Sequence, residues 1–141
     1  MEDYEQDFYA WTQRTAELLR AGRFDEADIE HVAEEIEDMG RRDVRELSSR
    51  MQVLLAHLLK WQVQTDQRSA SWRGTITAQR QELDSVLEQS PSLRPKLASG
   101  LADNYARAVK RAAAETGLGS DHFPDACPYR VEQVLDEDFL P

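Results

Sequence analysis

The sequence predicts an all-α fold, an up-and-down helical bundle with one unusually long central helix and a short C-terminal helix. Three observations lead to this prediction. Apolar residues recur at helical spacing along almost the whole chain, the strict alternation typical of strands is absent, and no repeat or low-complexity tract interrupts the pattern. With 141 residues, the chain is long enough to bury a core, and we expect a single domain over residues 1–141.

The composition excludes several classes of protein. The chain is 40% hydrophobic and 31% charged, with a formal net charge of −10, which disfavours a nucleic-acid binder that neutralises phosphates. No apolar run approaches the roughly 18 residues of a membrane helix. No signal peptide is readable in the acidic N-terminus, and one cysteine, Cys127, cannot form a disulfide within the chain. These features predict a cytoplasmic protein.

The charge is divided unevenly along the chain. Residues 1–47 hold 15 acidic and 6 basic side chains, residues 48–118 hold 6 and 10, and residues 119–141 hold 6 and 1. Acidic ends beside a basic middle suit either contacts within the chain or attraction of a partner.

The first predicted helix runs from Tyr4 to about Arg20. Its apolar face comprises four large side chains: Tyr4, Phe8, Trp11 and Leu18. Gly22 is the expected stop.

The second predicted helix is the long one, from about Asp25, its expected N-cap, to Gln64. An apolar stripe begins at Ile29 and keeps its phase past Gly40 to Trp61. A hairpin at Gly40 would shift that phase. Forty residues at about 1.5 Å each give about 60 Å, so we expect either a kink near Gly40 or a partner chain.

Three shorter elements are predicted after the polar loop 65–70. Ser71 is the expected cap of a third helix, and the proline-containing segment 90–95 separates it from a fourth helix that ends at Thr116–Gly117. A last short helix opens at Pro128 and continues to Leu135.

One segment of the long helix has the composition of a metal site. His31 and Glu35 are neighbours at i, i+4, as are Glu34 and Asp38. Di-metal bundles need two Glu-x-x-His pairs, whereas this chain offers only the Asp28-x-x-His31 pair. A solvated acidic flank is the simpler interpretation, and no metal is expected.

Two amides interrupt predicted apolar stripes, Gln79 on the third helix and Asn104 on the fourth. A buried amide needs a partner, so we expect a buried polar cluster. Its candidate members are Glu34, Glu35, Ser48, Ser49, His57, Thr75, Gln79, Arg80 and Asn104. Such a cluster either fixes helix register or forms a ligand or catalytic pocket.

Other polar residues carry weaker signals. Arg68, Arg73 and Arg80 surround the start of the third helix, where they could hold an anion, although a solvated, salt-bridged face is the simpler interpretation. Each tryptophan, including Trp11, needs an acceptor for its indole N–H if buried. The sequence contains no glycine-rich phosphate loop, Cys-x-x-Cys pair or Gly-x-Ser-x-Gly elbow, so no cofactor is expected.

The order of motifs resembles a bacterial domain-of-unknown-function family, number twenty-nine. The blocks that carry the resemblance span essentially the whole chain: residues 4–11, 33–37, 49–61, 71–80, 91–93, 115–117, 123–129 and 136–141. The resemblance implies an all-helical domain of bacterial origin, and it transfers no catalytic or binding residues.

Two functions remain open on these grounds. The leading hypothesis is a non-enzymatic protein–protein interaction or regulatory module, acting as a homodimer or with a protein partner, without nucleic acid or membrane. The alternative is a metal-binding protein or enzyme with a polar site near His57 and Gln79, so the sequence alone assigns no enzymatic activity.

Overall fold

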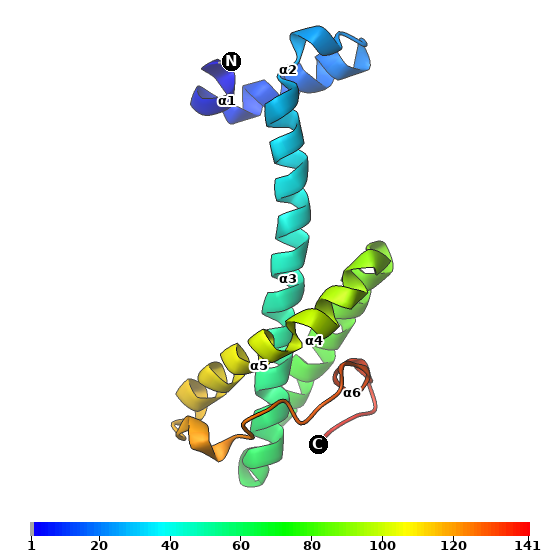
Figure 1. The fold of residues 1–141 in the computed structure, drawn as a ribbon. Helices are drawn as coiled ribbons and strands as arrows, with labels where there is room; N and C mark the ends of the chain where they lie inside the picture. The colour runs from blue at the N-terminus through cyan, green and yellow to red at the C-terminus, as the bar shows by residue number, and fades with distance from the viewer. Residues whose placement is uncertain (1) are drawn as a thin grey trace. The chain divides into compact units, whose positions relative to one another are not determined.

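The computed structural model describes residues 2–141, and within that range every regular element is helical (Figure 1). The α-helices are α1 (Glu2–Gln6), α2 (Phe8–Arg20), α3 (Ile29–Val63), α4 (Ala70–Gln89), α5 (Arg94–Thr116) and α6 (Val131–Leu135). The chain divides into two units, which we call unit 1 (Met1–Arg42) and unit 2 (Asp43–Pro141). The fold is therefore all-α, as predicted.

Unit 1 begins with two helices where the sequence predicted one. The backbone of Asp7 leaves the helical region, with φ −146° and ψ 82°, and its side chain accepts a hydrogen bond from the Ala10 amide at 3.1 Å. Asp7 thus caps α2 and separates it from α1, because a carboxylate satisfies an amide that the first helical turn leaves free.

A turn then leads from α2 to α3. Gly22 adopts φ +73°, a left-handed conformation that favours glycine. Phe24–Glu26 forms a 3-10 turn, so α3 begins at Ile29 rather than near Asp25. The effective cap is Asp28, whose side chain accepts from the His31 amide at 3.3 Å.

The long central helix is confirmed. α3 continues without interruption for 35 residues, from Ile29 to Val63, and includes Gly40 in helical conformation. Its buried side chains lie only in its second half: Leu47, Met51, Leu54, Leu55, Ala56, Leu58, Leu59 and Lys60.

The core of unit 2 is built by the second half of α3 with α4, α5 and the C-terminal segment. Ile76 and Leu83 of α4 and Leu97 of α5 pack with the α3 leucines, and each is at most 2% exposed. Val134 of α6 is fully buried in the same cluster. This packing is typical of amphipathic helices that share one apolar interior.

The ends of the shorter helices follow standard capping chemistry. Ser69, two residues before the predicted cap, accepts from the Trp72 amide at 3.2 Å and starts α4. Gly117, at φ +76°, ends α5 as predicted. No helix within residues 2–141 is long and apolar enough to cross a membrane.

Candidate functional site

A stacked tyrosine and histidine form the polar centre of unit 1. The rings of Tyr4 on α1 and His31 on α3 are stacked, with centroids 3.7 Å apart. The Tyr4 hydroxyl donates to Glu35 Oε1 at 2.6 Å, and His31 Nδ1 contacts Asp28 Oδ2. The i, i+3 and i, i+4 spacing on α3 places these three side chains on one face, toward α1.

The hydrogen bond to Glu35 stabilises the neutral form of the Tyr4 phenol. This bond, together with burial and the surrounding carboxylates, raises the pKa of Tyr4 to about 12. Tyr4 is a neutral donor at neutral pH, as an ordinary phenol is. Of the acidic side chains of this face, Glu35 bonds to Tyr4 and Asp28 to His31. Within residues 2–141, no group of three or more His, Cys, Asp or Glu side chains has the arrangement needed to hold a metal ion.

Trp11 is the buried centre of an aromatic group in unit 1. Its ring packs edge-on against Tyr4 at 4.8 Å between centroids and stacks with Phe8 at 5.6 Å. Trp11 is 3% exposed, and its Nε1 is the one buried side-chain polar atom in the described chain without a hydrogen-bond partner. An unpaired buried donor costs about 1–3 kcal/mol. The indole N–H of Trp11 therefore destabilises unit 1 relative to a core in which it had an acceptor.

The large apolar side chains that are exposed in the described residues all belong to unit 1. They are Phe8, Tyr9, Leu19, Phe24, Ile29, Ile36 and Met39. Three of them share one face of α3, because residues seven and three apart lie on one side of a helix. We call Ile29, Ile36 and Met39 the α3 row; their exposed fractions are 51%, 63% and 62%.

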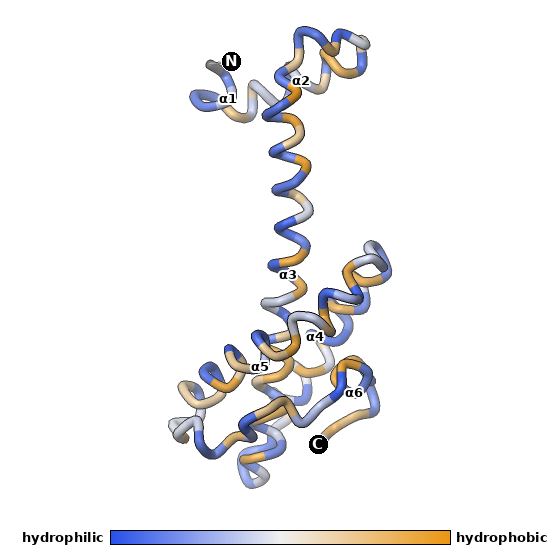
Figure 2. Tube along the Cα trace, viewed as in Figure 1, coloured by the Kyte–Doolittle hydropathy of each residue, from blue (hydrophilic) through white to orange (hydrophobic). Residues whose placement is uncertain are grey.

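The same helical pattern is buried in unit 2. Figure 2 shows that hydrophobic residues recur along the length of α3. Leu47, Leu54 and Leu58 continue the periodicity of the row, and all are at most 2% exposed, because α4 and α5 cover them. In unit 1 the described residues leave the row uncovered, so burial of this stripe stops halfway along α3.

The predicted polar residues of unit 2 lie in separate environments. Gln79 and Ser49 line one hollow of about 270 Å³, where Arg50 Nη1 donates to Gln79 Oε1 at 3.3 Å. Asn104 is buried and accepts from Gln52 Nε2 at 3.0 Å. The half-buried Gln79 and the buried Asn104 thus each have a partner on another helix, but the two partners are different residues.

The other predicted members are not joined to these two amides by hydrogen bonds. Ser48 and Thr75 are half-buried and make no side-chain hydrogen bond within the described residues. Glu34 is exposed on α3, and Glu35 bonds to Tyr4 in unit 1. His57 Nδ1 bonds to the Val53 carbonyl of its own helix at 2.9 Å.

A buried lysine, Lys60, lies near His57, and helical periodicity does not predict its burial. Lys60 Nζ bonds to Glu115 Oε2 at 2.6 Å and lies 5.1 Å from the centroid of the Trp72 ring. Burial, with the charge of Lys60, lowers the pKa of His57 below its usual value, so this imidazole favours the neutral form. The partner of Lys60 lies 55 residues away, which helical periodicity does not reveal.

Arg80 is buried rather than solvated, which corrects the expectation of a salt-bridged face. Its guanidinium donates to the carbonyls of Val134 and Phe139, both at 2.8 Å, and to those of Gln133 and Glu137 at 3.4 and 3.5 Å. Five N–H donors in a fixed plane suit several carbonyls at once. Arg80 thus holds the C-terminal segment against α4.

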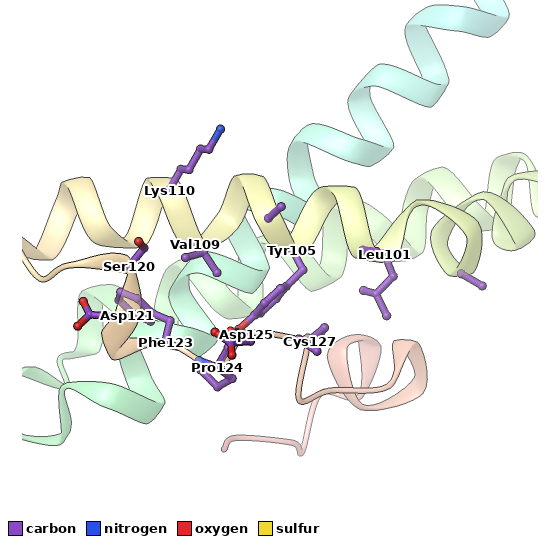
Figure 3. A pocket seen from close by; sticks show the side chains of 14 residues that line it. Leu101, Tyr105, Val109, Lys110, Ser120, Asp121, Phe123, Pro124, Asp125 and Cys127 are labelled. Atoms are coloured by element: carbon purple, nitrogen blue, oxygen red, sulfur yellow. Dashed lines mark hydrogen bonds between the residues drawn. The ribbon is translucent and has the colours of Figure 1, made fainter.

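A groove of about 840 Å³ lies between α5 and the segment Ser120–Cys127 (Figure 3). Its floor is mainly apolar, and the Tyr105 hydroxyl donates to the Pro124 carbonyl at 2.5 Å. Burial raises the pKa of Tyr105 to about 12 and also raises the pKa of the Cys127 thiol. Both groups therefore favour their neutral forms, which are poor nucleophiles and bases at neutral pH.

These features define an all-α protein. Its ionisable side chains described above form their hydrogen bonds and ion pairs within one unit. The family comparison agrees with this description: the model of a domain of unknown function, DUF29, matches residues 4–140. The chain therefore belongs to the DUF29 family, as the motif order suggested. Comparison with curated proteins and with solved structures found no match.

Proposed function

We propose that this chain is a protein–protein interaction module of the cytoplasm and that unit 1 supplies its docking surface. The observation that carries the proposal is the distribution of exposed apolar residues. All seven large apolar side chains that are exposed in the described residues lie between Phe8 and Met39. Exposed apolar side chains scattered singly need no explanation, whereas a group of them marks an interaction site.

The chemistry around the α3 row favours docking over catalysis. Tyr4 is bonded to Glu35, and His31 to Asp28, so the nearby ionisable groups hold unit 1 together. A general acid or base needs a polar atom that can reach a substrate. The row itself offers only aliphatic and thioether groups, which contribute to binding by removing apolar surface from water.

Site-specific photo-crosslinking in the cells that produce the protein tests this role. A benzophenone side chain placed at Ile36 is expected to capture a defined protein, since Ile36 is 63% exposed in the centre of the row. The matched control carries the same group at Gln81, an exposed position on α4 in unit 2. Met39→Glu should abolish the Ile36 product, because a charge in the row opposes apolar contact.

Two outcomes would overturn the proposal. One is equal capture from Ile36 and Gln81, which would show that the row has no preference for a partner. The other is a product from Ile36 that Met39→Glu leaves unchanged. Mass spectrometry of the product identifies what docks.

A further inference from the structure

The groove between α5 and the segment 120–127 continues toward the start of α5. A second hollow, of about 630 Å³, lies there, and its lining includes Arg94 and Val131. Ala98 and Leu101 line both hollows, so the two adjoin along α5. We call them together the α5 groove. The groove belongs to unit 2, so a role for it does not depend on the docking function proposed for unit 1.

The walls of the α5 groove are mainly apolar. α5 contributes Leu101, Tyr105 and Val109, and the facing segment contributes Phe123 and Cys127 (Figure 3). Pockets that hold small ligands have about 300–1,000 Å³ and are lined by apolar and aromatic side chains with few polar groups. The hollows of about 840 and 630 Å³ lie within that range. Leu101 and Val109 are only half-buried, so an apolar ligand here would remove their surface from water.

The α5 groove is also elongated. Its lining on α5 extends from Arg94 to Val109, a separation of fifteen residues, which is about 22 Å along the helix axis. An extended chain gains at most about 3.6 Å for every three single bonds, so about sixteen carbons reach about 18 Å. A hydrocarbon chain of about twelve to sixteen carbons with a polar group at one end therefore matches the length of the groove.

The end of the groove at the start of α5 is cationic. Arg94, Arg130 and Glu132 line this end, which gives a net charge of +1. Neither arginine forms an ion pair with another residue of the described chain. α5 begins at Arg94, so the positive end of its dipole lies on the same side. An anionic group is therefore favoured at this end.

The other end of the groove is acidic. Asp121 and Asp125 line it, and the basic residue of its lining, Lys110, extends away from Phe123 (Figure 3). Like charges repel, so an anionic group is disfavoured at this end. The two ends together set the direction in which a ligand with one charged end would lie.

We infer that the α5 groove binds a long-chain carboxylate, the chemistry of a fatty acid. The carboxylate lies at Arg94 and Arg130, because the planar N–H donors of a guanidinium match its two oxygens. The hydrocarbon chain lies along Leu101, Tyr105 and Val109, and its removal from water supplies most of the binding free energy. No covalent step is involved.

Isothermal titration calorimetry on the full chain tests this inference with three soluble probes below their micelle-forming concentrations. Dodecanoate is the ligand analogue, octanoate has a shorter chain, and dodecyltrimethylammonium has the same chain with a positive head group. Dodecanoate should bind with a stoichiometry of about one and at least about tenfold more tightly than either of the other probes. Octanoate buries less apolar surface, and the ammonium group meets two guanidinium groups.

A substitution that fills the groove tests its location. Ala98 is exposed and lines both hollows, so Ala98→Trp obstructs the groove without replacing a buried residue. We expect this variant to weaken binding of dodecanoate by about tenfold or more. Ala114→Trp is the matched control, since Ala114 is exposed on the same helix and lines neither hollow. Its effect should be less than about twofold.

A second pair of variants tests the position of the carboxylate. Arg94→Gln combined with Arg130→Gln should weaken binding of dodecanoate by about fivefold or more at low salt, because the cationic end is lost. The same variant should not weaken binding of dodecyltrimethylammonium. Arg107→Gln is the control: Arg107 is exposed on α5 and pairs with Asp103, and its loss should change affinity less than about twofold.

Four results would overturn the inference. The first is the absence of saturable binding of dodecanoate, and the second is equal binding of dodecanoate and dodecyltrimethylammonium. The third is unchanged binding of dodecanoate by Ala98→Trp. The fourth is dimerisation of the wild-type chain in sedimentation that Ala98→Trp abolishes, because a second copy would then occupy the groove.

Discussion

Arg80 shows how one buried side chain can hold a segment that has little regular structure. The guanidinium is 2% exposed and reaches four backbone carbonyls between Gln133 and Phe139. Those carbonyls belong to a short helix and an irregular tail, where backbone donors are few; the Gln133 carbonyl also accepts from the Asp136 amide at 3.2 Å. Hydrogen bonds to a charged donor contribute more than neutral ones.

Replacement of Arg80 by lysine is expected to destabilise the chain by about 2–4 kcal/mol. The ammonium lacks the planar fork, so several carbonyls lose their donor while the charge stays buried. Urea unfolding gives the free energy change. Arg73→Lys, on the exposed side of the same helix, should change stability by less than about 0.5 kcal/mol. Equal effects of the two substitutions would refute the anchoring role of Arg80.

The buried Lys60 and the exposed Glu115 form the one ion pair that links α3 to α5 in the described chain. Burial alone would raise the pKa of Glu115, but the hydrogen bond and charge of Lys60 outweigh it, and the net pKa is lowered. The folded state therefore holds fewer protons on Glu115 than the unfolded state does. Its contribution is present above about pH 4.5, the ordinary value, and is lost as the pH falls through the folded pKa.

Glu115→Gln should remove part of this acid sensitivity. We expect the variant to lose about 1–2 kcal/mol at pH 7, a figure reduced because Glu115 is partly exposed. The fall in unfolding free energy between pH 7 and pH 3.5 should be smaller than in the wild type. The control is Asp103→Asn, which removes the exposed pair of Asp103 with Arg107. An unchanged pH profile in Glu115→Gln would contradict the assigned linkage.

At the scale of elements, α3 is continuous because its apolar phase is continuous. Gly40 lies inside the helix, has no positive φ, and an added Cβ would meet no atom within 4 Å. No close contact within the chain therefore requires glycine at position 40. Glycine in a helix interior costs about 1 kcal/mol relative to alanine.

Gly40→Ala is accordingly expected to stabilise the chain by about 0.5–1 kcal/mol. Gly117→Ala should have the opposite sign, because Gly117 ends α5 at φ +76°, where a Cβ is strained. Thermal and urea unfolding of both variants measure the difference. Destabilisation by Gly40→Ala would mean that a bend or a close contact at Gly40 requires glycine.

The helices could be predicted from the sequence because periodicity and capping are local. The long α3, the stop at Gly117 and the short C-terminal helix all follow from spacing and glycine chemistry. The starts at Ala70 and Ile29 differ from the predicted ones because several serines or aspartates compete as caps within a few residues. The C-terminal helix begins at Val131, after the Arg130 cap, and not at the predicted Pro128. The first helix was not divided, because its apolar spacing continues across Asp7.

The side-chain partners could not be predicted in the same way. The sequence pointed to Gln79 as buried, whereas the neighbouring Arg80 is the deeply buried residue; one step along a helix turns a side chain by about 100°. Asn104 was expected to find a partner on another helix, but the identity of that partner, Gln52, depends on tertiary packing. The interaction of Lys60 with Glu115 spans 55 residues and leaves no local pattern.

At the scale of the whole molecule, burial and exposure are divided between the two units. Unit 2 holds the large buried cluster, while unit 1 buries Trp11, Thr15 and Leu18 and leaves seven large apolar side chains exposed. That residues 1–141 form a single domain stays a prediction. A unit with few buried contacts is expected to open locally more easily than the rest of the chain.

Native-state hydrogen exchange along α3, at a concentration where the chain is monomeric, tests this account most directly. Amides of residues 51–59 lie among fully buried side chains, so they should exchange only on global unfolding. Amides of residues 33–42 should be protected by the helix and yet exchange at least about tenfold faster. Equal protection of the two stretches in the monomer would show that the α3 row is covered within the chain and would contradict a free docking surface.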